Sequence, residues 1–401
     1  MNTSHNTNRQ RLLIVSGSYP NIRCGVSPHV TALAGRLVEG GEYDVVVLTS
    51  DDAEVKSDLA EGYQVYPRIA KWSVGQRGKI CDEILALEPE VVNIQNPSVE
   101  YLGWNSLIMS AVAPLLKRRA PQVRIVVMQH DIALSRSWLR RRYRPLFRAA
   151  DGIIVSNSRD YQAVREQKIP EKKIYRAPLS SHIKVRQRNR ENRANGRAAL
   201  EIPNDSICVA YFGYIHPGRN IDVLIRALAM IKEQNKSIHG IIMGGAYAGE
   251  EDYYKHCQEL ACELKLSKQI HWTGYATEET IAQGMAGADV FVSLPQRGAD
   301  MRNTSILSAM LADLPIVTTH NAKFFEDREM EELGCVCLRK IEPGAVAEAI
   351  LKALGNQPSS EFLERRREWL EPEAVWKKHV EILLRACRGL PPLKTELFSA
   401  K

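Results

Sequence analysis

Residues 11–49 read RLLIVSGSYPNIRCGVSPHVTALAGRLVEGGEYDVVVLT. The stretch begins with the apolar run LLIVS (12–16) and ends with a second one, DVVVLT (44–49). Nearly continuous apolar runs are typical of strands that are covered on both faces of a parallel sheet. Between the two runs, apolar residues recur at the spacing of one helix face: Val30, Leu33, Ala34, Leu37 and Val38. The stretch therefore predicts a β-α-β unit, from which doubly wound α/β sheets are built.

The same alternation of strand and helix continues along the chain and restarts once. The first series of predicted strands continues with 91–95, 124–129 and 152–156. The second series comprises 207–213, 240–244, 270–274, 289–294 and 315–319. Helices with an apolar stripe are predicted around 221–228 and 307–314. Two such series predict an α/β fold with two Rossmann-like, doubly wound parallel-sheet domains that face a cleft.

The polar, basic segment 181–197, SHIKVRQRNRENRANGR, separates the two series and is predicted to connect the domains. We expect an N-terminal domain over 1–181, a second domain over 182–368 and a C-terminal helix within 369–401. That helix is indicated by an apolar stripe with no strand after it, so it needs a surface to cover: Trp376, Val380, Leu383, Leu384 and Cys387.

Length and composition restrict the class of protein. At 401 residues, with 44% hydrophobic and 25% charged residues, the chain is long enough for two buried cores. No apolar run approaches the roughly 18 residues that cross a bilayer, and the polar start MNTSHNTNRQ lacks the pattern of a secretion signal. We therefore expect a soluble protein of the cytosol. Eight scattered cysteines include no C-x-x-C pair, so neither a disulfide nor a zinc site is predicted.

Basic residues gather in one segment, although the net charge of +7 is modest. Residues 136–148, RSWLRRRYRPLFR, combine arginines with apolar and aromatic residues. The segment has two interpretations: a face that binds anionic lipid headgroups or a phosphorylated substrate, or the solvated side of a helix packed in the core. Arg140, Arg141 and Arg142 are the candidates for an acceptor or membrane face. No recognition helix or stacking platform accompanies the charge, so nucleic-acid binding is not predicted.

Ligands of open α/β sheets bind beyond the carboxyl ends of the strands. Turns alone would call for glycine, asparagine and aspartate, whereas added arginine and histidine favour a ligand that bears phosphate. Arg302 precedes a predicted helix start, where unpaired N–H groups and the helix dipole attract anions. The strand-end candidates are Ser16 to Gly25, His130, Asp131, Gly213 to Arg219, Gly244, Gly245, Gly274, Tyr275 and the segment RGADMRNTSILSAM (297–310).

This order of motifs resembles the retaining glycosyltransferases of the GT-B superfamily, in particular the group 1, family 4-like bacterial mannosyl-, glucosyl- and N-acetylglucosaminyl-transferases. Residues 11–49 look like that family's opening strand, glycine loop and first helix. The segment YFGYIHPGRNIDVLIRAL (211–228) looks like the start of its second domain, and LPQRGADMRNTSILSAMLADLPIVTT (294–319) looks like its signature. The final helix resembles the one that crosses back onto the first domain.

The resemblance implies roles for individual residues of the second domain. Asp300 and Ser308 match the family's two signature glutamates, so Asp300 is expected to hold sugar hydroxyls and Ser308 the ribose. Arg219 matches a diphosphate-binding lysine, whereas Tyr214 stands where the family has a second cation, an arginine. We expect Arg302 to replace that cation at the diphosphate.

Further site residues follow from the same resemblance. His130 matches the first-domain histidine that contacts the sugar near the reacting carbon, so His130 and Asp300 are the expected catalytic residues. Gly25, Asn303 and Thr304 are expected to bind the donor diphosphate, and Asn303, Thr304 and Ser305 are expected to supply further donors or the helix N-cap. The expected contacts to the ribose and base are Ser308, Gly244, Gly274 and Tyr275.

The resemblance implies a retaining hexosyltransferase that uses a UDP-, GDP- or ADP-linked sugar and needs neither a metal ion nor another cofactor. The acceptor is expected to be a glycan or lipid-linked glycan of polysaccharide biosynthesis, reached in the cytoplasm or at the inner face of an anionic membrane. One alternative is a non-catalytic, glycosyltransferase-like protein that binds a nucleotide-sugar or a partner enzyme. A nucleotide-sugar epimerase of the same architecture is a third reading, but it would call for more carboxylates around the sugar.

Overall fold

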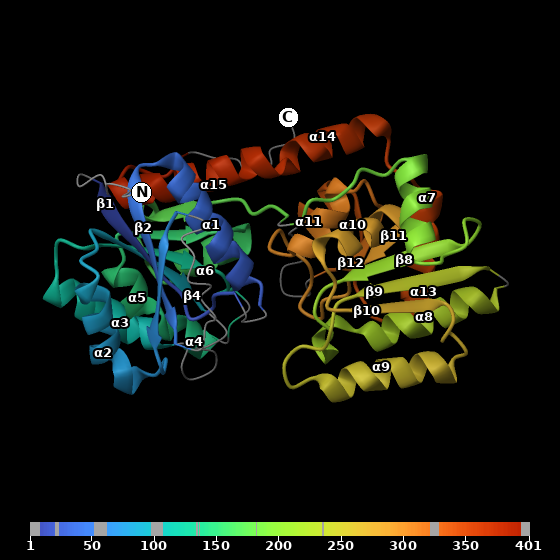
Figure 1. The fold of residues 1–401 in the computed structure, drawn as a ribbon, viewed down its shortest axis with the longest axis horizontal. Coiled ribbons are helices and arrows are strands. Elements are labelled where there is room, and N and C mark those ends of the chain that lie inside the picture. The colour runs from blue at the N-terminus through green and yellow to red at the C-terminus, as the bar shows by residue number, and fades with distance from the viewer. Residues whose placement is uncertain are drawn as a thin grey trace, which may run out of the picture. The chain divides into compact units, whose positions relative to one another are not determined.

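The computed structural model describes residues 9–20, 24–51, 62–97, 107–133, 135, 137–181, 183–234, 236–320 and 329–393. The chain forms two compact units (Figure 1). The first comprises residues 1–178 and 376–401, and the second comprises residues 179–375.

A seven-stranded parallel sheet forms the centre of the first unit, with the strand order β3-β2-β1-β4-β5-β6-β7. The order reverses between β1 and β4, which is where open sheets of this kind bind ligands. In β1, residues 12–15 have no exposed surface, as expected for a strand covered on both faces. The strands are β1 (Gln10–Val15), β2 (Tyr43–Ser50), β3 (Gln64–Ile69), β4 (Val91–Asn96), β5 (Arg124–Gln129), β6 (Gly152–Val155) and β7 (Ile174–Arg176).

Helices on the first unit's sheet include α1, whose buried stripe contains Val30, Leu33 and Leu37, as the sequence predicts. The helix ends at a left-handed Gly41, whose N–H donates to the Val38 carbonyl. The helices are α1 (Val26–Gly40), α2 (Arg77–Ala86), α3 (Ile108–Arg119), α4 (Ser137–Arg142), α5 (Arg144–Ala149) and α6 (Ser158–Arg165), with 3₁₀ turns at Val74–Gln76 and Glu171–Lys173.

The C-terminal helix α15 (Pro372–Arg388) belongs to the first unit from Trp376 onward. Arg124 Nε donates to the Ala386 carbonyl at 2.8 Å, and the Tyr175 hydroxyl donates to the Leu390 carbonyl at 2.6 Å. A Cβ on Gly152 would lie 3.1 Å from that of Ala386, so the helix packs closely on β6. The C-terminal end of α15 and the residues after it therefore contact β5, β6 and β7 of the same unit, whereas Trp376 near its start stacks on His29 of α1.

Replacing Tyr175 with phenylalanine is expected to lower the free energy of unfolding by about 1 kcal/mol, because the Leu390 carbonyl loses its donor. Urea unfolding followed by circular dichroism measures this change. An unchanged midpoint would show that this hydrogen bond does not hold the C-terminal segment.

A six-stranded parallel sheet forms the second unit, with the order β10-β9-β8-β11-β12-β13. Its order reverses between β8 and β11. The strands are β8 (Ile207–Phe212), β9 (Ile238–Met243), β10 (Ile270–Gly274), β11 (Val290–Val292), β12 (Ile316–Thr319) and β13 (Cys335–Leu338). The helices are α7 (Arg190–Ala199), α8 (Ile221–Glu233), α9 (Glu251–Glu263), α10 (Glu278–Gly287), α11 (Thr304–Leu311), α12 (Glu329–Glu332), α13 (Pro343–Gly355) and α14 (Ser360–Leu370), with a 3₁₀ turn at Pro217–Arg219.

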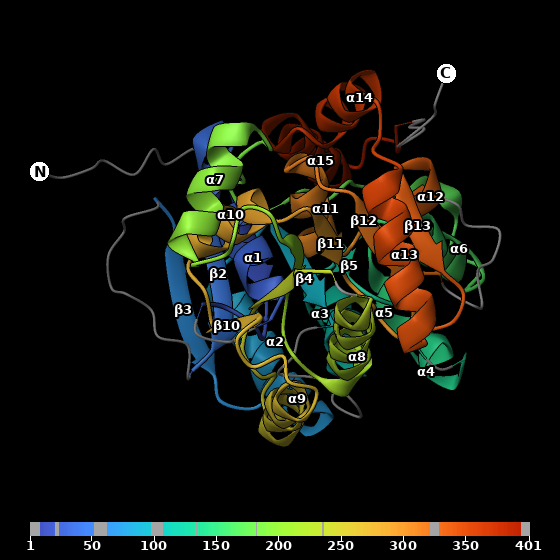
Figure 2. The same cartoon turned by 90° about the vertical axis from the view of Figure 1, so that its right-hand side faces the viewer.

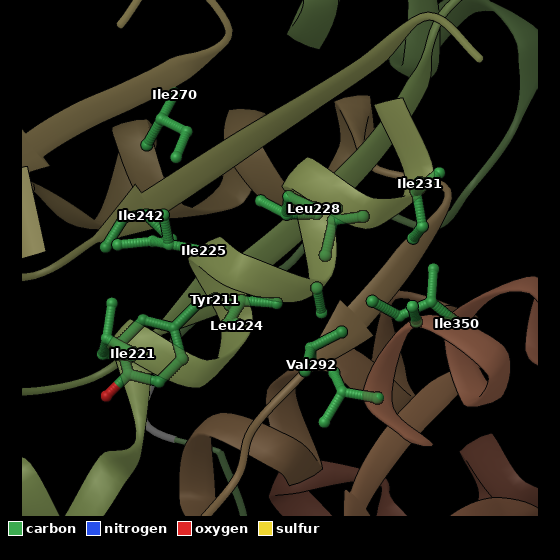
Figure 3. Packing of buried hydrophobic residues seen from close by; sticks show 14 of the residues in the cluster. Tyr211, Ile221, Leu224, Ile225, Leu228, Ile231, Ile242, Ile270, Val292 and Ile350 are labelled. Carbon is green, nitrogen blue, oxygen red and sulfur yellow. The ribbon is translucent and has the colours of Figure 1, made fainter. Parts of the chain in front are cut away.

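Helix α8 supplies much of the second unit's core. Figure 3 shows Ile221, Leu224 and Ile225 of this helix beside Tyr211 of β8 and Ile242 of β9. Helix α13 packs next to α8 on the same side of the sheet (Figure 2). The doubly wound parallel sheet that the sequence predicts is therefore confirmed in both units.

The prediction that 181–197 only connects the two domains is wrong for residues 190–197. Residues 190–199 form α7, which packs against α10 in the second unit. A Cβ on Gly196 would lie 2.4 Å from the Gln283 carbonyl oxygen, so only glycine allows the helices to approach this closely. Because α7 uses a glycine rather than an apolar stripe for its contact, hydrophobic periodicity does not reveal it.

Arg197 of α7 is fully buried and pairs with Asp289, which precedes β11. The distance from its Nη2 to Asp289 Oδ2 is 2.5 Å, and its guanidinium also donates to the carbonyls of Gly287 and Pro203. Arg188 and Arg193 reach the other carboxylate oxygen of Asp289, Oδ1, at 3.2 and 3.0 Å. The carboxylate of Asp289 thus pairs with three arginines and fixes α7 to the sheet.

Among the residues that the structure describes, no helix has the length and apolar character needed to cross a membrane.

Candidate functional site

Three glycine turns end neighbouring strands in the second unit. Gly213 follows β8, Gly244 follows β9 and Gly274 ends β10. Gly244 has φ +144°, and a Cβ there would lie 2.0 Å from the Gly213 carbonyl oxygen. No other residue fits this position, because both the backbone angle and the contact exclude a side chain. The turns after β8 and β9 therefore pack backbone against backbone.

Aromatic side chains extend from these turns. The ring centroids of Tyr214 and Tyr247 are 5.8 Å apart, and those of Tyr214 and Tyr275 are 6.5 Å apart, both edge to face. The Tyr275 hydroxyl donates to the Ala246 carbonyl, although half of its side chain is exposed. A Cβ on Gly245 would meet the Tyr275 ring at 2.6 Å, so this ring lies directly on the backbone. Tyr214, Tyr247 and Tyr275 thus pack together at the carboxyl ends of β8, β9 and β10, and we call this cluster the tyrosine wall.

Arg219 lies beside this wall, at the end of the 3₁₀ turn before α8. Its Nε is buried without a hydrogen-bond partner, and the guanidinium has no ion pair within the described part of the chain. Helix α8 starts after a left-handed Asn220 that provides no side-chain cap. A cation next to an uncapped helix start is a suitable site for an anion.

The same turn contacts the loop on the other side of the switch point. The Gln296 N–H donates to the Gly218 carbonyl at 2.9 Å, and Asn220 Nδ2 donates to the Leu294 carbonyl at 2.8 Å. Leu294 and Gln296 follow β11 and lead into residues 297–310, which we call the signature segment. The structure therefore brings Arg219 and the 297–310 segment together at the reversal of strand order in the second unit.

His216 is part of the same turn, and its ring lies 5.8 Å from that of Tyr247. Burial, followed by the positive charge of Arg219, lowers the pKa of His216 to about 4. Both effects disfavour the imidazolium ion. His216 is therefore neutral at neutral pH and does not offset the charge of a bound anion.

The depressed pKa of His216 predicts a loss of stability in acid. Between about pH 6.5 and pH 4 the unfolded chain binds a proton at His216 that the folded chain does not bind, so the free energy of unfolding falls as the pH falls. The expected result is a shallower fall in His216→Asn than in the wild type, measured as urea midpoints against pH. The exposed His256 provides the control variant His256→Asn, and equal pH slopes in all three proteins would contradict the prediction.

The signature segment is held by its own charges. Arg302 forms a forked ion pair with Asp300, with Nη2 to Oδ2 at 2.7 Å and Nε to Oδ1 at 3.0 Å. Asn303 Oδ1 accepts from the Asp300 N–H at 2.9 Å, and Asn303 rather than Ser305 occupies the N-cap position of α11. Asp300 is almost completely buried. Its negative charge is offset by the guanidinium of Arg302. The predicted contact of Arg302 with a diphosphate stays a prediction, and it requires this pair to open or rotate.

Ser308 is also bonded within the second unit. Its hydroxyl donates to the Thr304 carbonyl at 2.8 Å and lies 2.6 Å from the Ser181 hydroxyl, and only 1% of Ser308 is exposed. Thr304 is the first residue of α11. The predicted ribose contact of Ser308 therefore stays a prediction, with weaker geometric support than the phosphate contact of Arg219.

In the first unit, His130 follows β5 at the carboxyl end of the sheet. Its N–H donates to the Asn96 carbonyl at 2.7 Å, and its ring lies 5.2 Å from that of His29, edge to face. The next turn is fixed by the buried carboxylate of Asp160, which accepts from the N–H groups of Ile132 and Ala133. The backbone is thus fixed both at His130 itself and in the turn that follows it.

Gly25 and the arginine segment also belong to the first unit. Gly25 is exposed directly before α1, and no atom of the described residues lies within 4 Å of a Cβ added there. In the segment, Leu146 and Phe147 are buried, which agrees with a helix packed in the core. Arg140 pairs with Glu166 at 3.3 Å, whereas Arg141 and Arg142 are exposed. Trp138 is 41% exposed, with the Arg142 guanidinium 5.3 Å from its ring, so part of an amphipathic surface remains.

Sequence reasoning did not single out Tyr247, although it named Gly245 and, within the range Gly213 to Arg219, His216. A signal was present, because an aromatic residue follows a glycine within two positions at all three strand ends: FGY, GGAY and TGY. It also missed two amides, Asn93 and Gln95, because they lie inside an apolar run that predicts a strand. Polar residues at alternate positions of a buried strand are the signal that could have revealed them.

Comparison with known proteins agrees with this geometry. The model of the family "Glycosyl transferases group 1" matches residues 192–369. The D-inositol 3-phosphate glycosyltransferase of Streptomyces scabiei is 25% identical over 185 residues, which are 43% of this chain and 41% of that protein. The chain thus spans about two-fifths of the length of the curated relatives that it matches.

Solved structures resemble nearly the whole chain. The Anabaena protein HepE, in complex with UDP and glucose, superposes with a TM-score of 0.71 at 17% identity over 94% of this chain and 100% of its own. Sucrose-phosphate synthase from Thermosynechococcus elongatus gives a TM-score of 0.73 at 17% identity over 94% and 99% of the two chains. This likeness shows the fold alone: two parallel-sheet α/β units. Residues 192–369, which form most of the second unit, match the model of the group 1 glycosyl transferases.

Proposed function

We propose that the protein is a glycosyltransferase that binds a nucleoside diphosphate sugar with its second unit and transfers the sugar with retention. The observation that carries the proposal is Arg219, whose buried Nε has no hydrogen-bond partner among the described residues and which lies at the start of α8. A diphosphate supplies the acceptors that this group lacks, and its charge is stabilised by the helix terminus. HepE is described in complex with UDP-glucose and with UDP, which makes these the first probes.

The tyrosine wall and the glycine turns give this proposal its second element. Gly244 lets the turns after β8 and β9 pack together, Gly274 has open space among the described residues where a side chain would stand, and Tyr275 offers an exposed ring face. We propose that the ribose and base of the donor bind here, next to the phosphates at Arg219. Asn303 and Thr304, at the start of α11, would supply further donors to the phosphates.

For the transfer step we propose His130 and Asp300 as the residues that contact the sugar. Loss of the leaving diphosphate with retention develops positive charge on the sugar and negative charge on the phosphate, so holding the phosphate is the main electrostatic requirement. Neither a metal ion nor a cofactor is part of this proposal. Activity that survives a chelating agent is the corresponding expected result.

A thermal-shift panel of UDP, GDP, ADP and their sugar conjugates tests the proposal. A ligand at about 100 times its Kd stabilises the folded protein by about 2.7 kcal/mol, so the true donor gives the largest shift. Hydrolysis of that donor, with the anomer of the released sugar determined by NMR, then tests turnover and retention. The variant His130→Ala is expected to bind the donor but not to transfer the sugar. Absence of any shift across the panel would overturn the proposal.

A non-catalytic protein is the second candidate, and two observations favour it. Ser308 replaces a carboxylate and is buried in internal hydrogen bonds, and Arg302 is paired with Asp300. This candidate predicts nucleotide-sugar binding without hydrolysis or transfer. The panel and the hydrolysis assay together distinguish the two.

For the acceptor we propose a glycan or lipid-linked glycan that is reached at an anionic membrane surface. Arg141, Arg142 and the exposed Trp138 support this, since basic and aromatic side chains suit a lipid headgroup region. Flotation with vesicles that contain or lack anionic lipid tests it. Equal flotation with both vesicle types would remove the membrane from the proposal.

A further inference from the structure

Two buried amides on β4 lie behind His130. Asn93 and Gln95 are two residues apart on the strand, so their side chains point to the same face of the sheet, and neither has any exposed surface. Asn93 Nδ2 donates to the Val126 carbonyl at 3.3 Å, and Gln95 Nε2 donates to Asn93 Oδ1 at 2.5 Å. Gln95 Oε1 then lies 2.8 Å from His130 Nε2. The four groups form one chain of hydrogen bonds.

The direction of this chain is fixed at its far end. The backbone carbonyl of Val126 only accepts, so Asn93 has to present its NH₂ group there and its oxygen to Gln95. Gln95 in turn has to present its NH₂ group to Asn93 and its oxygen to His130. An amide oxygen has no proton to give. The proton between Gln95 and His130 therefore belongs to His130 Nε2.

We infer that Asn93 and Gln95 are positioning residues that hold neutral His130 in the tautomer with its proton on Nε2 and its lone pair on Nδ1. The His130 N–H bond to the Asn96 carbonyl and the edge-on ring of His29 fix the backbone and restrict the ring. In this tautomer Nδ1 is the hydrogen-bond acceptor of the His130 ring. This ring nitrogen accepts from a hydroxyl but repels a carboxylate oxygen.

The catalytic meaning of this assignment rests on the proposed function, whereas the tautomer itself does not. If His130 contacts the sugar, the assignment favours donors that present a hydroxyl to Nδ1 over uronic acid donors that present a carboxylate. Loss of the amide chain would misplace the acceptor nitrogen. We expect kcat to fall by up to about 100-fold in such variants, with little change in UDP affinity, because UDP binding is proposed for the second unit.

NMR of the full-length protein labelled with ¹⁵N-histidine tests the tautomer directly. Long-range ¹H–¹⁵N correlation at about pH 8.5, where histidine is ordinarily neutral, distinguishes the protonated from the unprotonated ring nitrogen. His130→Gln identifies the signal of His130 among the ten histidines. The expected wild-type result is a protonated Nε2 and an unprotonated Nδ1.

Two variants test the role of the amides. Gln95→Met removes the acceptor with little change in shape, and a mixture of both tautomers is expected. Asn93→Leu allows the Gln95 amide to turn and present its NH₂ group, so a shift toward the Nδ1–H tautomer is expected. Gln129→Met is the matched control, because Gln129 is equally buried but bonds to Asn96 and to the Asp131 carbonyl instead of the His130 ring.

Circular dichroism shows whether each variant folds. If Gln95→Met does not fold, the wild-type spectrum and Asn93→Leu still decide the question. A wild-type His130 with its proton on Nδ1 overturns the inference, and so does a tautomer unchanged in both folded variants. The expected tautomer in a protein that binds no nucleotide-sugar would instead overturn the proposed function and leave the inference standing.

Discussion

Isothermal titration is expected to show that Arg219→Ala raises the Kd for UDP by about 10- to 100-fold. The guanidinium has no ion pair to lose within the described residues, so its removal costs the phosphate contact alone. Hydrogen bonds to charged groups contribute about 1.5–3 kcal/mol each, and about 1.4 kcal/mol corresponds to a tenfold change in Kd. The protein should remain as stable as the wild type in the absence of nucleotide.

Two further variants make this result specific. Arg226→Ala removes an exposed arginine from the same helix, α8, and should leave the Kd for UDP within about 0.5 kcal/mol of the wild type. Arg302→Ala should have a smaller effect than Arg219→Ala, because Asp300 already offsets its charge. A loss as large as that of Arg219→Ala would show that the Asp300–Arg302 pair opens when nucleotide binds. Unchanged binding in Arg219→Ala would remove the main support for the proposed donor site.

Asp289→Ala is expected to have the largest effect on stability, a loss of about 3–5 kcal/mol in the free energy of unfolding. Arg197, which has no exposed surface, would remain buried without its carboxylate, and the Cys208 N–H would lose the acceptor that it now has at 2.9 Å. Arg188 and Arg193 would lose the same partner. Urea unfolding measures the change.

The control for this variant is Glu279→Ala. Glu279 pairs with Arg186 at 2.6 Å, but both side chains are largely exposed, so the expected loss is below about 1 kcal/mol. Equal losses in the two variants would mean that burial does not govern the strength of the Asp289 pair. A loss near zero in Asp289→Ala would show that the arginines find other acceptors.

Most of the fold follows from the apolar runs of the sequence, and the exceptions have physical reasons. Strand β3 lies at the edge of its sheet and is only partly buried, so its sequence QVYPRI has no continuous apolar run. Strand β7 has only three residues. Helix α7 contacts its neighbour through Gly196 and a buried arginine, neither of which contributes to a hydrophobic pattern.

The sequence predicts which residues lie at the strand ends of the candidate site, but it does not predict which side chains contact one another there. Because ligands bind at strand ends, Arg219, Gly244 and Tyr275 could be named from the sequence, and the structure places them at the carboxyl ends of neighbouring strands in one unit. The pairing of Arg302 with Asp300 depends on the backbone path of a short loop, which residue types do not determine.

The first unit is made from two separate pieces of chain, and the second from one continuous piece. During synthesis, residues 179–375 leave the ribosome before Trp376 and the rest of α15, which β5, β6 and β7 need as a cover. Because domains fold as units while the chain is made, the second unit is able to reach its native state first. The piece that is synthesised first therefore completes its folding last, and until then the sheet surface under α15 is open to unwanted association.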